Sequence, residues 1–229
     1  MFSNVYLAST QREIAEFLPK KAAYLSCHFS SSGKGLSNLP HRLPEGSLLL
    51  VDDSMPVYGH ESASVAKQLC DLVAQFSPKA ILLDFQRGWS AEAQEMAQAI
   101  LRSVPCPVAV TESYAKALGC AVFLSAVPAD VRLEKHLSPW LEQGVFLELS
   151  PCGLAIEVTQ NGCKKAPLGA QAELPLYDNK LFCHYAVQVL SDKTAFTLAR
   201  TGEDLAALAD EALRLGALGV VGLFQELCR

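Results

Sequence analysis

The stretch Lys79-Ala80-Ile81-Leu82-Leu83-Asp84-Phe85-Gln86 is an almost uninterrupted apolar run that ends in polar side chains. A strand with one face in water alternates apolar and polar residues, whereas a strand covered on both faces is apolar along its length. The run therefore predicts a buried strand of a parallel sheet over Ala80–Gln86, with Asp84 and Gln86 at its carboxyl end.

Runs of the same kind recur along the chain, and amphipathic stretches separate most of them. The clearest helical patterns are Glu61–Phe76, Ala91–Val104 after a capping residue at Ser90, and Gly202–Leu215, which ends at Gly216. Repeated strand–helix units predict a parallel α/β fold, and eight principal strands favour a small, closed (β/α)8 TIM-type barrel over an open doubly wound sheet. With Ala80–Gln86, the predicted strands are Val5–Ser9, Ala22–Phe29, Ser47–Asp53, Pro107–Ser113, Cys120–Ala126, Val145–Ser150 and Gly219–Phe224.

Two segments interrupt this alternation. Ser30–Gly46 is rich in Ser, Gly, Pro and Asn, which predicts a long loop after the second strand. Pro151–Leu181 follows the seventh strand and contains turns at Pro151-Cys152-Gly153 and Asn161-Gly162, the second typical of a hairpin. A second hairpin is predicted around Ser191-Asp192-Lys193. We therefore expect a single barrel domain over residues 1–229 with an inserted β-hairpin region after the seventh strand.

Composition limits the classes of function. Half of the 229 residues are hydrophobic and 19% are charged, as in a globular protein, and the net charge of −5 provides no basic surface for nucleic acid or anionic membranes. We expect a small ligand or a protein partner, with the oligomeric state left open. Apolar runs stay well below the roughly 18 residues of a membrane span, and the N-terminus lacks a signal-peptide pattern. The eight cysteines form no CxxC pair, so reduced thiols and a cytoplasmic location are expected.

Functional groups of a βα barrel gather at the carboxyl ends of its strands. Adjacent residues of a strand point to opposite faces, so only one of Asp52 and Asp53 can face the barrel mouth, and the pair is expected to anchor a loop rather than a metal ion. The histidines lack metal-ligand spacing and no nucleotide-binding loop is present, so neither metal nor cofactor is predicted. The candidate ligand-binding residues at this end are His28, Asp52, Asp84, Gln86, Trp89 and Tyr114, and the candidate catalytic residues are Asp84, Gln86, Glu112 and Glu148.

The predicted strand at Lys79–Gln86 resembles the DxxDxDxE strand of glycoside hydrolase family 18, the chitinase family. The final helix and strand, Gly202–Phe224, are similar to the family's ending. Val145–Pro151, followed by an inserted hairpin region, is similar to its layout. The resemblance extends over about residues 79–227 and implies a TIM-type barrel with a sugar-binding mouth.

Individual residues depart from the family pattern. The family's first two aspartates fall on Lys79 and Leu82, its third on Asp84, and its catalytic glutamate on Gln86. An amide has no proton to donate at neutral pH, so Gln86 cannot act as a general acid. The tyrosine expected near Ser125 has no counterpart, and the tryptophan of the last strand is replaced by leucine. The resemblance therefore implies a chitinase-like barrel without its proton donor.

Three functions remain open at this point. The sequence favours a non-catalytic barrel that binds a saccharide or a protein partner at the carboxyl ends of its strands. A second hypothesis is an active glycoside hydrolase, or another hydrolase, that uses Glu112 and Glu148 as acid and base, because paired carboxylates on either side of a sugar can cleave a glycosidic bond. A third hypothesis is a structural or assembly protein whose barrel mouth is closed.

Overall fold

The computed structural model describes residues 2–32, 35–151, 153–168 and 174–228. Within these ranges, eight parallel strands pair in a ring, and the first strand pairs with both the second and the last, which closes the barrel. Every strand predicted from the apolar runs is present, so the small TIM-type barrel is confirmed. The barrel strands are β1 (Tyr6–Ser9), β2 (Ala22–Phe29), β4 (Leu48–Asp52), β5 (Ala80–Asp84), β6 (Val108–Thr111), β7 (Ala121–Leu124), β8 (Val145–Leu149) and β14 (Gly219–Leu223).

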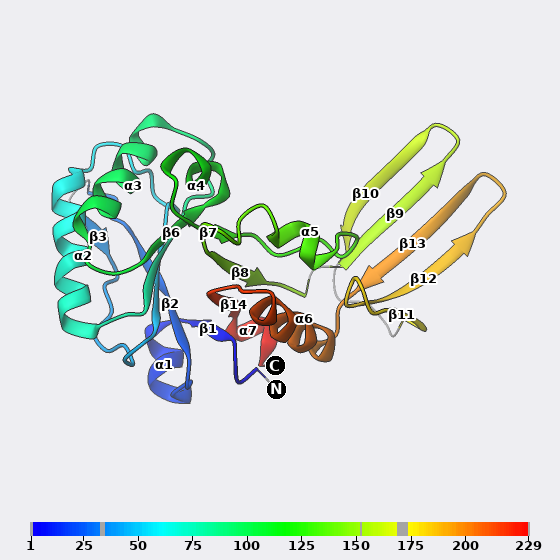
Figure 1. Cartoon of the computed structure of the whole chain (residues 1–229), viewed down its shortest axis with the longest axis horizontal. Coiled ribbons are helices and arrows are strands. Elements are labelled where there is room, and N and C mark those ends of the chain that lie inside the picture. The colour runs from blue at the N-terminus through cyan, green and yellow to red at the C-terminus, as the bar shows by residue number, and fades with distance from the viewer. Residues whose placement is uncertain (1, 33–34, 152, 169–173, 229) are drawn as a thin grey trace.

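Helices cover the outside of the barrel, with α2 and α3 on one side and α5 and α6 toward the second sheet (Figure 1). The three predicted helices are confirmed to within one residue at each end, and the Ser90 hydroxyl accepts the Ala93 N–H at 3.1 Å, as a capping residue should. Between β2 and β4 the described residues form no helix but a short strand, β3 (Leu36–Ser37), antiparallel to β2. The helices are α1 (Gln11–Phe17), α2 (Ser62–Phe76), α3 (Ala91–Ser103), α4 (Glu112–Leu118), α5 (Leu133–Leu137), α6 (Gly202–Arg214) and α7 (Phe224–Leu227).

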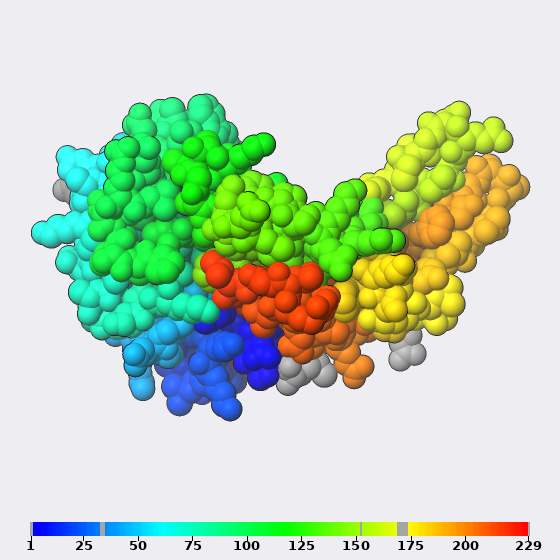
Figure 2. All heavy atoms as spheres, in the orientation of Figure 1, coloured from blue at the N-terminus to red at the C-terminus, as the bar shows by residue number. Residues whose placement is uncertain are grey.

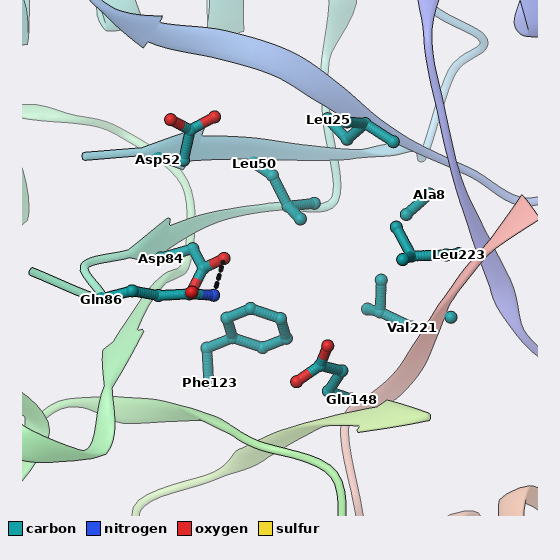
Figure 3. A pocket seen from close by; sticks show the side chains of 11 residues that line it. Ala8, Leu25, Leu50, Asp52, Asp84, Gln86, Phe123, Glu148, Val221 and Leu223 are labelled. Carbon is teal, nitrogen blue, oxygen red and sulfur yellow. Dashed lines mark hydrogen bonds between the residues drawn. The ribbon is translucent and has the colours of Figure 1, made fainter. Parts of the chain in front are cut away.

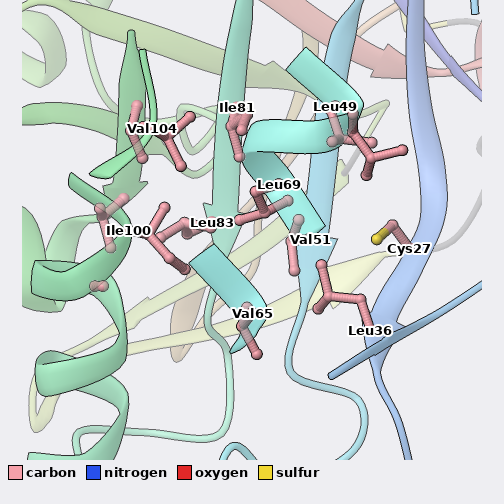
Figure 4. Packing of buried hydrophobic residues seen from close by; sticks show 14 of the residues in the cluster. Cys27, Leu36, Leu49, Val51, Val65, Leu69, Ile81, Leu83, Ile100 and Val104 are labelled. Carbon is pink, nitrogen blue, oxygen red and sulfur yellow. The ribbon is translucent and has the colours of Figure 1, made fainter. Parts of the chain in front are cut away.

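Alternation along each strand sorts the core into two layers. On β4, Leu48 and Leu50 belong to the cluster inside the barrel, whereas Leu49 and Val51 pack outward with residues of α2 and α3 (Figure 4). The inner cluster consists of Tyr6, Ala8, Ala23, Leu48, Leu50, Ala80, Leu82, Ala109, Phe123, Phe146 and Val221. The inward-facing residues that follow this cluster toward the carboxyl ends of the strands therefore line the barrel mouth.

The inserted region after β8 folds into one five-stranded antiparallel sheet in the order β10-β9-β13-β12-β11. Both predicted hairpins are confirmed, and β9 also pairs with β13, which joins the two hairpins. Cys152 of the predicted turn lies outside the described residues. The sheet projects from the body of the barrel (Figures 1 and 2). Its strands are β9 (Gly153–Thr159), β10 (Gly162–Leu168), β11 (Leu176–Asp178), β12 (Cys183–Val189) and β13 (Lys193–Ala199).

Arg200 fastens this sheet to the barrel. The side chain is 6% exposed, and its guanidinium donates to the backbone carbonyls of two segments. One segment is the loop after β7, at Val127 and Pro128, and the other precedes β12, at Leu181 and Phe182. A planar guanidinium with five N–H groups suits such a convergent set of acceptors.

The seven cysteines in the described part of the chain are free thiols. Burial raises the pKa of the Cys27 thiol to about 12 and those of Cys106 and Cys183 to about 11. These three thiols therefore remain protonated and unreactive near neutral pH. Among the described helices, none has the length and apolar character needed to cross a membrane.

Candidate functional site

A cavity of about 210 Å³ opens at the carboxyl ends of the barrel strands (Figure 3). Its floor is apolar and its charged members are three carboxylates, from Asp52, Asp84 and Glu148. Leu50 and Asp52 both line it because residues two apart on a strand share a face. The lining consists of Ala8, Leu25, Leu50, Asp52, Asp84, Gln86, Phe123, Glu148, Val221, Gly222 and Leu223.

Asp84 is the last residue of β5, and its register partner on β4 is Asp52. The Gln86 side-chain amide donates from Nε2 to Asp84 Oδ1 at 3.2 Å and to Oδ2 at 3.0 Å. Burial raises the pKa of Asp84, the negative charges of Asp52 and Asp53 raise it further, and the hydrogen bond from Gln86 offsets part of the effect. Gln86 is thus the neutral donor that holds this carboxylate in place.

Glu148 comes from β8, and its carboxylate and that of Asp84 turn toward one another across the ring of Phe123 (Figure 3). Burial raises the pKa of Glu148, the charge of Asp84 raises it further, and a smaller contribution comes from Glu226. A hydrogen bond to the backbone of Ala126 partly opposes this increase. The mouth therefore contains two carboxyl groups that bind protons more readily than exposed carboxyl groups do.

Asp53 anchors a loop, the role expected for the pair, and its neighbour Asp52 faces the cavity, so only one of the two lies at the mouth as predicted. Asp53 is 4% exposed, and its carboxylate accepts the backbone N–H of Gln86 at 2.8 Å and that of Arg87 at 3.0 Å. The Arg87 side chain donates back to the Asp53 carbonyl at 2.6 Å. This exchange fixes the loop after β5 and with it the position of Gln86 at the cavity.

Three other candidates lie apart from the cavity lining. His28 is half-buried on β2, with Nδ1 3.1 Å from the carbonyl oxygen of Ser26. Glu112 is the first residue of α4, outside the lining. Trp89 is 63% exposed on the loop after β5, and its indole N–H donates to the side chain of Gln94 at 3.2 Å. Its ring is therefore largely exposed to solvent.

Tyr114 occupies a different environment from the predicted one. The predicted strand Pro107–Ser113 is wrong at its end, because β6 stops at Thr111 and α4 begins at Glu112. The helix places Tyr114 in the core with 0% exposure, so the ring has no surface to offer a ligand. Its hydroxyl donates to the Gly88 carbonyl at 2.7 Å and accepts the Ser90 N–H at 3.0 Å. Tyr114 thus supports the loop that carries Trp89.

Four of the candidates named from the sequence line the same cavity in the structure. They are Asp52, Asp84, Gln86 and Glu148. Sequence reasoning missed the apolar part of the lining, Phe123 above all. Alternation within Cys120–Ala126 pairs Phe123 with Ala121 on one face, but the sequence does not reveal which face of such a strand turns inward.

Comparison with known proteins gives a match in fold. No model of a protein family matches the chain, and no curated protein matches it in sequence. A chitinase from Chromobacterium violaceum matches with a TM-score of 0.54 at 13% identity, over 96% of this chain and 93% of that one. The chitinase-like agglutinin of Robinia pseudoacacia gives 0.55 at 11% identity, over 96% and 94%. A family GH18 chitinase from Cycas revoluta, in complex with allosamidin, gives 0.56 at 10% identity, over 96% and 94%. The chain has the barrel fold of chitinases and chitinase-like proteins.

Proposed function

We propose that this chain is a chitinase-like barrel that binds a saccharide at the carboxyl ends of its strands and does not cleave it by the chitinase mechanism. The observation that carries the proposal is the hydrogen bond from Gln86 to both oxygens of Asp84. Gln86 stands where the resemblance assigns the proton-donating glutamate, and an amide has no proton to transfer at neutral pH. A site that has lost its general acid can still bind its ligand.

The composition of the cavity supports a sugar as the ligand. A pyranose presents apolar C–H faces and hydroxyl donors, and the cavity combines the Phe123 ring with carboxylate acceptors at Asp84 and Glu148. The volume of about 210 Å³ is below the roughly 300–1,000 Å³ of sites for drug-sized ligands, so one ring fits better than several. Trp89, exposed three residues after Gln86, offers a flat ring for a neighbouring sugar unit.

A thermal-shift titration with N-acetylglucosamine oligomers tests this proposal. A ligand that binds the folded state raises the melting temperature as its concentration passes its Kd. We expect a saturable rise that is lost in Asp84→Ala and retained in Asp71→Ala, which removes an exposed carboxylate from α2. Absence of any rise across oligomer lengths in the wild-type protein would contradict binding of N-acetylated saccharides.

A hydrolase is the second candidate, favoured by one observation. The raised pKa of Glu148 suits a proton donor, and Asp84 rather than the predicted Glu112 lies across the cavity from it. Release of methylumbelliferone from chitobiose and chitotriose conjugates decides between the two functions. Turnover that falls by about 100-fold in Glu148→Gln would favour the hydrolase, whereas turnover insensitive to this change would exclude Glu148 as the donor.

A further inference from the structure

The barrel-mouth cavity carries negative charge without a cationic side chain in its described lining. Its ionisable members are Asp52, Asp84 and Glu148. The charged groups near Asp84 are Asp52 at the end of β4, Asp53 directly after it, and Glu148 on β8; Glu148 also lies near Glu226 on α7. Every one of these neighbours is acidic. A ligand with a positive charge would reduce the repulsion among these carboxylates.

The rest of the lining indicates what kind of cation fits. Leu25, Leu50, Val221 and Leu223 join the ring of Phe123 in an apolar wall beside the carboxylates. Mg²⁺ and Ca²⁺ take oxygen ligands on all sides, including retained water, so an apolar wall does not complement a bare ion. An organic ammonium does, because its carbon skeleton contacts the wall while its N–H groups face the carboxylates.

We propose that the cavity binds an amino sugar through a free ammonium group, a glucosamine unit rather than an N-acetylated one. The inference deepens the proposed saccharide function and rests on it. The ammonium lies between Asp84 and Glu148, and the pyranose C–H face lies against Phe123. Gln86 already satisfies one side of Asp84, which leaves its remaining lone pairs for the ligand.

This arrangement has two measurable electrostatic consequences. An ammonium beside Asp84 and Glu148 favours their ionised forms, so binding near the pKa of either group releases protons. Affinity should therefore increase with pH from the acidic side until the amine itself loses its proton. Added salt should weaken the interaction, though less than it weakens contacts between exposed charges.

Isothermal titration calorimetry with two trisaccharides tests the proposal. The probes are the trimer of glucosamine and its fully N-acetylated counterpart, in two buffers of different ionisation enthalpy. We expect the amine trimer to bind about tenfold more tightly, as one charge-assisted hydrogen bond would provide, and to release protons. Asp84→Asn and Glu148→Gln should each weaken it by about tenfold.

Glu95→Gln is the matched control, because it removes the same charge from an exposed position on α3. If it weakens the amine trimer as much as Glu148→Gln does, the attraction is general and the proposal is overturned. Equal or tighter binding of the acetylated trimer also overturns the ammonium inference but leaves the proposed saccharide function standing. Failure of both trimers to bind overturns the saccharide function as well. The comparison of trimers on the wild-type protein does not depend on how any variant folds.

Discussion

Asp84 and Glu148 face each other across the ring of Phe123. Burial raises the pKa of Glu148, and the charge of Asp84 raises it further. The two residues come from β5 and β8, and both occupy inward positions beyond the apolar layer of the barrel. Each carboxyl group therefore titrates in the field of the other, and a change in one changes the affinity of the other for protons.

Asp84→Asn should lower the pKa of Glu148. The substitution removes the opposing charge while burial remains, so the pKa should stay above that of an exposed glutamate. Carboxyl ¹³C chemical shifts followed through a pH titration measure it directly. Asp71→Asn on the outer face of α2 is the control and should leave the titration unchanged. An identical pKa in Asp84→Asn would show that the two groups do not interact.

Glu148→Gln should alter the pH dependence of stability. Because the folded-state pKa of Glu148 is raised, the folded protein binds more protons than the unfolded chain from about pH 4 upward. The free energy of unfolding that this residue contributes therefore falls as pH rises through that window. Urea denaturation should show the variant gaining stability relative to wild type with increasing pH.

Glu157→Gln should change the pH dependence of stability in the opposite direction from Glu148→Gln. Its hydrogen bond to Lys193 lowers the pKa of Glu157, so that residue contributes stability above its ordinary pKa and loses it as pH falls. Relative to wild type, this variant should lose stability with increasing pH. Equal slopes for the two variants would contradict the assignment for Glu148.

Gln86→Glu should destabilise the protein by about 1 kcal/mol at neutral pH. The ionised carboxylate cannot donate to Asp84, and it adds a further negative charge beside Asp52 and Asp84. The loss should diminish in acid, where the carboxyl groups are protonated. Gln98→Glu makes the same change on the exposed face of α3, and urea denaturation of both variants separates the local effect from net charge.

Tyr114→Phe should cost about 1–3 kcal/mol, because it leaves the Ser90 N–H and the Gly88 carbonyl without their partner. Chemical denaturation measures the loss. Tyr58→Phe, at a side chain that is 75% exposed, should stay within about 0.5 kcal/mol of wild type. If both variants have the same stability, the hydroxyl of Tyr114 does not hold the loop.

Arg200→Met should destabilise the attachment of the second sheet by about 3–5 kcal/mol, because buried carbonyls on two segments lose their donor. Hydrogen exchange should accelerate in β12, in β13 and around Val127. Arg200→Lys should not restore protection, because an ammonium cannot reach the same spread of acceptors. Arg12→Met at the exposed surface of α1 is the control, and exchange in its second sheet should match wild type.

The barrel could be predicted from the sequence because each of its strands leaves a pattern in its own stretch of residues. Strands covered on both faces are continuous apolar runs, and all eight of them are visible. Alternation also predicts that only one of Asp52 and Asp53 faces the mouth, but not which one; the structure places Asp52 there. The pairing of β9 with β13 could not be predicted, because it joins two hairpins through contacts that leave no local pattern.

The polar residues of the candidate site could be predicted from the sequence, whereas its apolar lining could not. Asp84, Gln86 and Glu148 end or follow apolar runs, and barrel geometry brings such positions to one rim. The predicted place of Tyr114 is wrong because strand Val108–Thr111 runs directly into α4. The strand ends two residues before the predicted Ser113, and this shift moves Tyr114 from the mouth to the core. The apolar lining depends on which face of each strand turns inward, and a strand buried on both sides does not show this.

The pairing of Tyr6 with Val221 closes the ring between the first and the last strands of the barrel. During synthesis on the ribosome, β1 has β2 beside it almost at once, but its other edge stays open until β14 has emerged. The ring cannot close on a partial chain, and contacts of such long sequence separation form slowly. Nascent chains that stop short of β14 therefore expose two strand edges, which makes them substrates for chaperones or for aggregation.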